Sequence, residues 1–137
     1  MVKPLPQRWL LQAEADLSAA RDSERSAHYE WACFQAQQSA EKAVKALLYK
    51  EGFTSILTHS VTDLVARARE FSAELGAMDA AAKHLDSFYL TTRYPNALVS
   101  DLPPAQFHSE EDAAQCLSYA ESILNAVKKY VESSSAS

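Results

Sequence analysis

Glycine is scarce in this chain, which has only two glycines among 137 residues. Because the tight turns of β-rich proteins depend on glycine, this scarcity argues against an all-β fold and favours long helices joined by few loops. Long apolar runs are also absent, since no stretch approaches the roughly 18 apolar residues of a membrane-spanning helix. The first residues, MVKPLPQRWL, lack the apolar core of a signal peptide. We therefore expect a soluble, cytoplasmic protein with no membrane partner.

Residues that hold metals, phosphates or disulfides are few and scattered. Cys33 and Cys116 lie far apart inside apolar patterns, so we predict buried, reduced thiols and neither a disulfide nor a metal pair. The four histidines show no metal-site spacing and no glycine-rich phosphate loop is present, so no metal and no cofactor are expected. The formal net charge of −5 gives no general attraction to nucleic acid, and such binding would need a local basic patch.

Helical periodicity dominates what is present. Apolar residues recur every three or four positions, which predicts helices at about 7–21, 27–51, 60–75, 78–93 and 109–130. Gly52 and Gly76 end the second and third of these, and the proline-containing segment 94–108 is expected to be a long loop. The predicted fold is a single all-α domain over residues 1–137, with its core at about 7–132 and a frayed tail at 133–137. It is an antiparallel bundle of about five helices with a long loop before the last helix.

Three polar residues share one side of the second predicted helix. Gln38, Glu41 and Lys45 are spaced by three and four positions, as neighbours on a helix face are. One interpretation is an ordinary solvated stripe in which Glu41 and Lys45 form an ion pair. The other is a polar lining for a site under the long loop. Spacing favours the first interpretation without excluding the second.

The string TRYPNA, at residues 92–97, stands where the fourth helix should end. Pro95 disfavours the α conformation at Tyr94, and Thr91 and Thr92 can hydrogen-bond back to preceding carbonyl groups. Arg93 would then lie at a helix C-terminus, where its charge interacts favourably with the helix dipole and its donors can satisfy free carbonyls. Alternatively, its guanidinium beside an aromatic ring would suit a phosphate group and a stacked base.

The chain resembles the HEPN domain family in five ordered strings that cover roughly residues 7–132. They are QRWLLQAEADLSAA, YEWACFQAQQSAEKAVKALLYKEG, THSVTDL, FYLTTRYPNA and FHSEEDAAQCLSYAESILNAVKKY. The first string is also similar to the sacsin C-terminal type of this domain. The resemblance implies an all-α bundle, commonly a homodimer. Some members are metal-independent ribonucleases, often toxins paired with a small nucleotidyltransferase antitoxin, and others are non-catalytic modules that bind nucleotides, dimerise or act as scaffolds.

The resemblance also sets an expectation about catalysis. Nuclease members carry an arginine and a histidine a few residues apart, late in the bundle, but here residues 94–107 separate Arg93 from His108. Arg21 and His28 have a closer spacing, yet they flank the first loop, so we interpret that match as accidental. No catalytic residue is therefore assigned from the sequence, and ribonuclease activity is not expected.

The function expected from the sequence is a non-catalytic HEPN module that homodimerises and binds a nucleotide, ATP or GTP, or another phosphate-bearing ligand, within a chaperone-type protein. Two alternatives stay open: a metal-independent HEPN ribonuclease of the toxin–antitoxin class, with a nucleotidyltransferase partner, and a purely structural interaction domain. The residues expected to bind the ligand, by charge, stacking or hydrogen bonding, are Arg93, Lys45, Lys42, Tyr94, Tyr89, His59 and Asn96.

Overall fold

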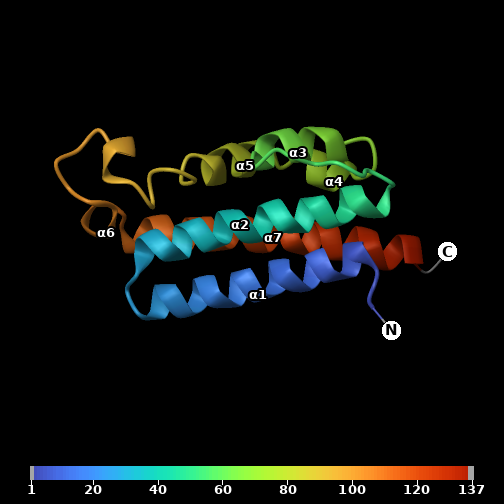
Figure 1. Cartoon of the computed structure of the whole chain (residues 1–137), viewed down its shortest axis with the longest axis horizontal. Helices are drawn as coiled ribbons and strands as arrows, with labels where there is room; N and C mark the ends of the chain where they lie inside the picture. Colours follow the sequence, from blue (N-terminus) through green and yellow to red (C-terminus); the bar gives the residue numbers. More distant parts are fainter. Residues whose placement is uncertain (1, 136–137) are drawn as a thin grey trace.

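The structure, a computed structural model, describes residues 2–135, and in this range every regular element is helical. Three long helices and two groups of short ones make up the chain (Figure 1). The elements are α1 (Leu5–Arg25), α2 (Tyr29–Lys50), α3 (Val61–Ala68), α4 (Ala73–Gly76), α5 (Asp79–Asp86), the 3₁₀ turn η1 (Pro95–Ala97), α6 (Pro104–Phe107) and α7 (Glu110–Ser135). The predicted all-α class is confirmed.

Helix α2 occupies the centre of the bundle. Figure 1 shows α1 and α7 alongside it, with α3, α4 and α5 layered on its other side and α6 at the far end from the two termini. Five of its fourteen buried residues are alanines, including Ala36, Ala40 and Ala43, which are fully buried. Small side chains allow neighbouring helices to approach closely, while Leu47 and Leu64 fill the remaining core. Each buried leucine contributes about 1.5–3 kcal/mol through the burial of apolar surface.

The structure has seven α-helices within residues 2–135, against the five expected. The third and fourth expected helices are shorter than predicted, and the short helices α4 and α6 are additional. The third expected helix ends at Ala68, and Ser72 begins the separate α4 by accepting a hydrogen bond from the Leu75 N–H at 3.1 Å. The fourth ends at Asp86, and residues 87–93 form turns in its place. Five helices have seven or more residues, and α4 and α6 have four each.

The ends of the chain also differ in detail from the expectation. Helix α7 continues to Ser135, past the expected end near Tyr130 and into the segment predicted to be a frayed tail. Residues 136 and 137 of that tail lie outside the described residues. The long segment 94–108 is not wholly irregular, because it contains η1 and α6, and Pro104 is buried.

The structure also bears on two other expectations, the state of the two cysteines and the absence of a membrane-spanning helix. Cys33 and Cys116 are free and buried, as predicted. A hydrogen bond with the Cys116 thiol, followed by burial, raises the pKa of the Cys33 thiol far above its ordinary value. Across residues 2–135 no helix is both long and apolar enough to span a bilayer.

Candidate functional site

Most of the residues predicted to bind a ligand lie where α2 meets the segment before α3 and the turns after α5. We call Phe34, Glu41, His59, Tyr89 and Arg93 the Tyr89 cluster. The rings of His59 and Tyr89 are stacked, with centroids 5.6 Å apart and planes inclined by 15°. The guanidinium carbon of Arg93 lies 4.6 Å from the centre of the Tyr89 ring. Tyr89 therefore has contacts with both a histidine and an arginine.

Arg93 is held among aromatic rings. Its guanidinium carbon lies 4.5 Å from the centre of the Phe34 ring and 5.0 Å from that of Tyr94. Its Nε donates a 3.1 Å hydrogen bond to the Tyr89 carbonyl, as expected for an arginine that satisfies a carbonyl at the end of a helical segment. Cation–π contacts of this kind contribute about 0.5–2 kcal/mol each. These contacts fix the guanidinium through its face and Nε, and within residues 2–135 neither Nη group donates a hydrogen bond, so both can donate to a ligand.

A buried ion pair lies beneath His59. The side chains of Glu41 and Lys45 are only 4% and 5% exposed, and Lys45 Nζ donates to Glu41 Oε2 at 3.0 Å. His59 Nδ1 lies 3.4 Å from Glu41 Oε1, an oxygen that is buried and accepts no hydrogen bond from the described residues. The His59 side chain itself is 61% exposed. An exposed imidazole therefore rests on a buried carboxylate, which orients the ring and leaves Nε2 for a ligand.

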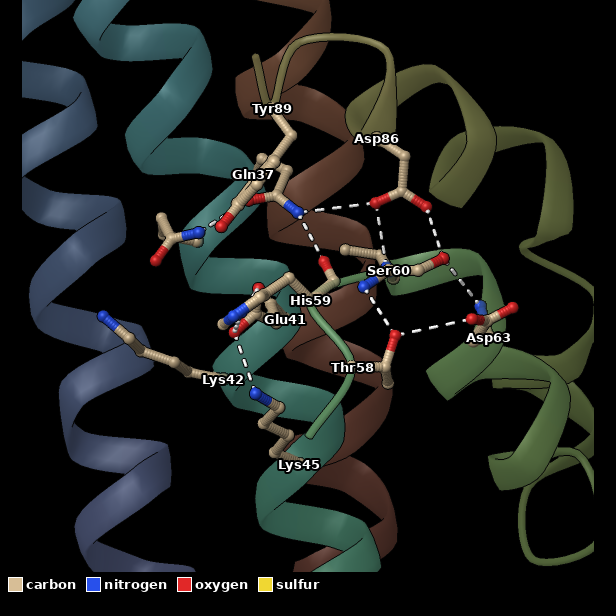
Figure 2. A network of polar contacts seen from close by, with 12 residues as sticks. Gln37, Glu41, Lys42, Lys45, Thr58, His59, Ser60, Asp63, Asp86 and Tyr89 are labelled. Carbon is tan, nitrogen blue, oxygen red and sulfur yellow. Dashed lines mark hydrogen bonds and ion pairs between the residues drawn. The ribbon is translucent and has the colours of Figure 1, made fainter. Parts of the chain in front are cut away.

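Two side chains hold the backbone around His59 in place (Figure 2). Gln37, fully buried on α2, donates from Nε2 to the His59 carbonyl at 3.0 Å. Asp86, the last residue of α5, accepts hydrogen bonds from the Val61 and Thr62 N–H groups at 2.8 and 2.9 Å. It also accepts from the hydroxyls of Ser60 and Thr62. Asp86 thus caps α3, and its negative charge lies at the positive end of the helix dipole.

The structure brings together most of the ligand-binding residues predicted from the sequence, but not all of them. Arg93, Tyr94, Tyr89, His59 and Lys45 lie in or against the Tyr89 cluster. Two others do not join it. Lys42 extends toward α1 (Figure 2), where its Nζ is 2.6 Å from Asp16 Oδ2, and Asn96 is exposed in η1.

Sequence reasoning missed three residues that build this site. Asp86 and Gln37 carry no local signal, because their partners His59, Ser60, Val61 and Thr62 lie far away in the sequence. Phe34 follows the apolar spacing of a core aromatic, yet it is half-buried and packs against Arg93. Contacts between residues that are far apart in the sequence produce no periodic pattern in the sequence, so they could not be predicted from spacing.

The histidines that the sequence analysis compared with the nuclease pattern lie elsewhere. His108 is buried between Phe88 and Phe107, with Nε2 at 2.9 Å from the Thr91 carbonyl. His28 precedes α2 and is exposed, and Arg21 forms an ion pair with Glu121 on α7 at 3.1 Å. None of these three residues forms a hydrogen bond or ion pair with the Tyr89 cluster within the described part of the chain, and the interpretation of the Arg21–His28 spacing as accidental stays a prediction.

Two open cavities lie near the cluster. The Tyr89 pocket, about 200 Å³, is lined by His59, Ser60, Asp86 and Tyr89. The α1 pocket, about 270 Å³, is lined by Leu5, Arg8, Trp9, Gln12 and Lys42. No group of three or more His, Cys, Asp or Glu side chains within residues 2–135 is placed to hold a metal ion. The Tyr89 pocket itself offers the His59 imidazole, the Ser60 hydroxyl, the Tyr89 ring and the Asp86 carboxylate, whose hydrogen bonds go to residues 60–62. Arg93 does not line the pocket, but its guanidinium packs on the Tyr89 ring, so an imidazole, an aromatic ring and a guanidinium lie together, a set that suits a phosphate group with an attached base.

The chain is similar to a known domain family and to two named proteins. The family model described as the HEPN domain matches residues 6–130. A Methanocaldococcus jannaschii protein named "Putative toxin MJ1304" is 28% identical over 133 residues, covering 90% of this chain and 86% of that protein. Human sacsin is 33% identical over 107 residues, which make up 75% of this chain but only 2% of sacsin. The resemblance to the HEPN domain, including the sacsin segment, is confirmed.

Solved structures show the same fold. A Thermus thermophilus protein superimposes with a TM-score of 0.85 at 37% identity, over 91% of this chain and 97% of that one. An archaeal HEPN homologue gives a TM-score of 0.75 at 35% identity, over 93% and 98%. An HEPN domain protein of Thermotoga maritima gives 0.70 at 28% identity, over 91% and 98%.

Proposed function

The chain belongs to the HEPN domain family, and from this premise we propose that it acts on RNA as a toxin-class ribonuclease whose reaction takes place at the Tyr89 pocket. This is the alternative kept open by the sequence analysis, and similarity to a toxin-named protein over most of both chains now favours it. The observation that carries the proposal is the pairing of an exposed His59 with a buried Glu41 beside the ring-held Arg93.

The chemistry of this site matches RNA cleavage by proton transfer. In such a reaction the ribose 2′-oxygen loses its proton and attacks the adjacent phosphorus, and the 5′-oxygen leaves as it gains a proton. The products are a 2′,3′-cyclic phosphate and a 5′-hydroxyl. His59 would carry the proton through Nε2 while Glu41 orients its ring. Arg93 would bind the phosphate oxygens and stabilise the charge that develops on them.

A direct assay tests this assignment. Wild-type protein is incubated with total RNA at equimolar ratio, beside His59→Ala, Arg93→Ala and the matched control His28→Ala. His28 is exposed and lies outside the Tyr89 cluster, so its variant should cleave RNA like the wild type. His59→Ala should cleave about 100-fold more slowly or worse, because general acid–base groups contribute at least that much. RNA left intact by the wild-type protein would overturn the proposal.

A second candidate is the non-catalytic module that binds a nucleotide. It is favoured by the ion pair between Lys45 and Glu41, which neutralises the carboxylate, and by the wide separation of Arg93 from His108 along the chain. Calorimetric titration with ATP and GTP tests this function. Heat with wild type that is lost in Arg93→Ala, together with intact RNA, would support it. If the protein neither binds ATP or GTP nor cleaves RNA, the remaining function is the purely structural interaction domain.

A homodimer and a small nucleotidyltransferase partner stay predictions for either function. Several large apolar side chains are exposed along the segment between α5 and α7, which is a surface suited to a protein partner. They are Leu90, Tyr94, Val99, Leu102 and Phe107. Light scattering of the purified chain would test self-association, and a monomer at micromolar concentration would contradict the homodimer.

A further inference from the structure

The Tyr89 pocket and the α1 pocket are linked by one buried lysine. Lys45 Nζ touches Glu41 Oε2 at 3.0 Å and also lies 5.6 Å from the centre of the Trp9 ring. Glu41 is the residue beneath His59 in the Tyr89 cluster, and Trp9 lines the α1 pocket. Lys45 lines neither cavity, but it contacts Trp9 at the α1 pocket and, through Glu41, the His59 side of the Tyr89 pocket. A ligand with two recognition groups joined by a phosphate could reach both.

The α1 pocket has the composition of a base-binding site. Trp9 is half-buried and stacked against Tyr49, with ring centroids 5.6 Å apart and planes inclined by 29°, so its indole is held by a partner. Gln12 lies at the pocket wall, where its Nε2 donates to Asp16 Oδ1 at 2.8 Å and its Oε1 is an acceptor for a base, and Leu5 adds an apolar surface. A volume of about 270 Å³ is below the usual 300–1,000 Å³ of pockets for drug-sized ligands. It suits one planar base better than a whole nucleotide.

The charges around the α1 pocket leave one cation without a carboxylate partner. Lys42 is paired with Asp16 at 2.6 Å, and Lys45 is paired with Glu41. Arg8 is exposed, and of its guanidinium only Nε is engaged within the described residues, donating to the Lys3 carbonyl at 3.1 Å. Arg8 is therefore the side chain at this pocket with charge and donors available to a phosphate group.

We infer that the α1 pocket binds a base of an unpaired RNA strand whose neighbouring phosphate lies in the Tyr89 pocket. This inference rests on the proposed action on RNA and specifies its substrate as single-stranded. Stacking on an aromatic side chain requires a base that is free of its helical neighbours, which a duplex does not supply. Trp9 stacks the base, Arg8 binds the phosphate on its outer side, and Lys45 lies beneath the strand between the pockets.

The two tryptophans of the chain allow a selective test, because Trp31→Phe leaves Trp9 as the single tryptophan. Trp31 is 47% exposed, so this replacement leaves the core intact. The variant is titrated with a 2′-O-methyl RNA hexamer, which has no free 2′-hydroxyl and cannot be cleaved. We expect saturable quenching of Trp9 fluorescence by the single strand and none by the same hexamer in a duplex.

Two further variants in the same background test the cation. Arg8→Ala should raise the Kd for the hexamer by about three- to fivefold, since one exposed charge contact is worth up to about 1 kcal/mol, which is about fivefold in Kd. Arg25→Ala is the matched control at the other end of α1, where Arg25 pairs with Asp22, and it should bind like its parent. If both variants raise the Kd for the hexamer equally, the loss of affinity comes from the net charge of the protein, and the specific role of Arg8 is overturned.

The outcomes separate this inference from the proposed catalysis. Cleavage of RNA by wild type with unquenched Trp9 would overturn the base-binding pocket and leave the ribonuclease function standing. Quenching of Trp9 with no cleavage would support the pocket and overturn the ribonuclease. Equal quenching by duplex and single strand would overturn the requirement for an unpaired base.

Discussion

His59 Nδ1 lies 3.4 Å from the Oε1 atom of Glu41, a buried oxygen that accepts no hydrogen bond from the described residues. The other oxygen, Oε2, accepts from Lys45 Nζ at 3.0 Å and lies 3.5 Å from His59 Nδ1. One carboxylate on α2 thus contacts both a buried ammonium and an exposed imidazole. An unsatisfied buried acceptor is costly, so the burial of Glu41 Oε1 without a hydrogen bond from the described residues is a feature that packing alone does not explain.

Glu41→Gln should destabilise the protein strongly. The change leaves the ammonium of Lys45 buried without its counter-ion, and breaking one side of a buried pair costs about 3–5 kcal/mol. Urea unfolding measures the loss. The control is the double variant Glu41→Gln with Lys45→Met, which removes the unpaired charge and should recover much of the lost stability. A single-variant loss far below this range, about the 0–1 kcal/mol of an exposed pair, would show that the pair is open to water.

Asp86→Asn should loosen the segment that carries His59. The carboxylate accepts four hydrogen bonds from residues 60–62, and bonds to a charged group contribute about 1.5–3 kcal/mol. We expect a loss of this size in thermal unfolding. Asp63→Asn is the matched control on the same helix, because its carboxylate makes a 3.4 Å contact with Thr58. Equal losses in the two variants would contradict a special role for Asp86.

The elements that the sequence predicts well are those with local causes. Helix α2 runs almost as expected because its apolar spacing is unbroken and Gly52 follows it with φ of 97°. The threonines before Arg93 behave as expected, since Thr91 and Thr92 donate to carbonyls four residues earlier. The apolar spacing of the third helix hides its break, because Ser72 starts a new turn while Phe71 still packs against the core.

The site is predicted less completely, since half of it depends on the path of the chain. Spacing alone pairs Glu41 with Lys45. The contacts of His59 with Glu41 and of Asp86 with Gln37 join residues far apart in the sequence, so they depend on the tertiary fold. Lys42 was expected to join the cluster and instead pairs with Asp16 on α1. One position along a helix turns a side chain by about 100°, which separates Lys42 from Glu41.

Ala27→Gly should stabilise the protein. Ala27 lies between α1 and α2 with φ of 61°, a left-handed conformation that costs a residue with Cβ about 1–2 kcal/mol. Glycine avoids most of that strain but has more freedom in the unfolded chain, so we expect a net gain of about 0.5–1 kcal/mol by chemical denaturation. Gly52→Ala is the converse control, because an added Cβ meets no atom within 4 Å and any loss comes from its φ of 97°. Stability unchanged in both variants would contradict the backbone argument.

Tyr130 near the end of α7 should make stability depend on pH in the alkaline range. A hydrogen bond to Glu51, followed by burial and by the negative charge of that carboxylate, raises the pKa of Tyr130 from 10.0 to about 12. Since the folded pKa is above the unfolded one, the phenol contributes stability that is complete below pH 10 and is lost as pH rises toward 12. Phenolate absorbance should show one tyrosine ionising late, and Glu51→Gln should return it toward the ordinary range. If the wild type and Glu51→Gln lose stability identically above about pH 10, the ordinary pKa of tyrosine, the contact between α7 and the end of α2 does not hold in solution.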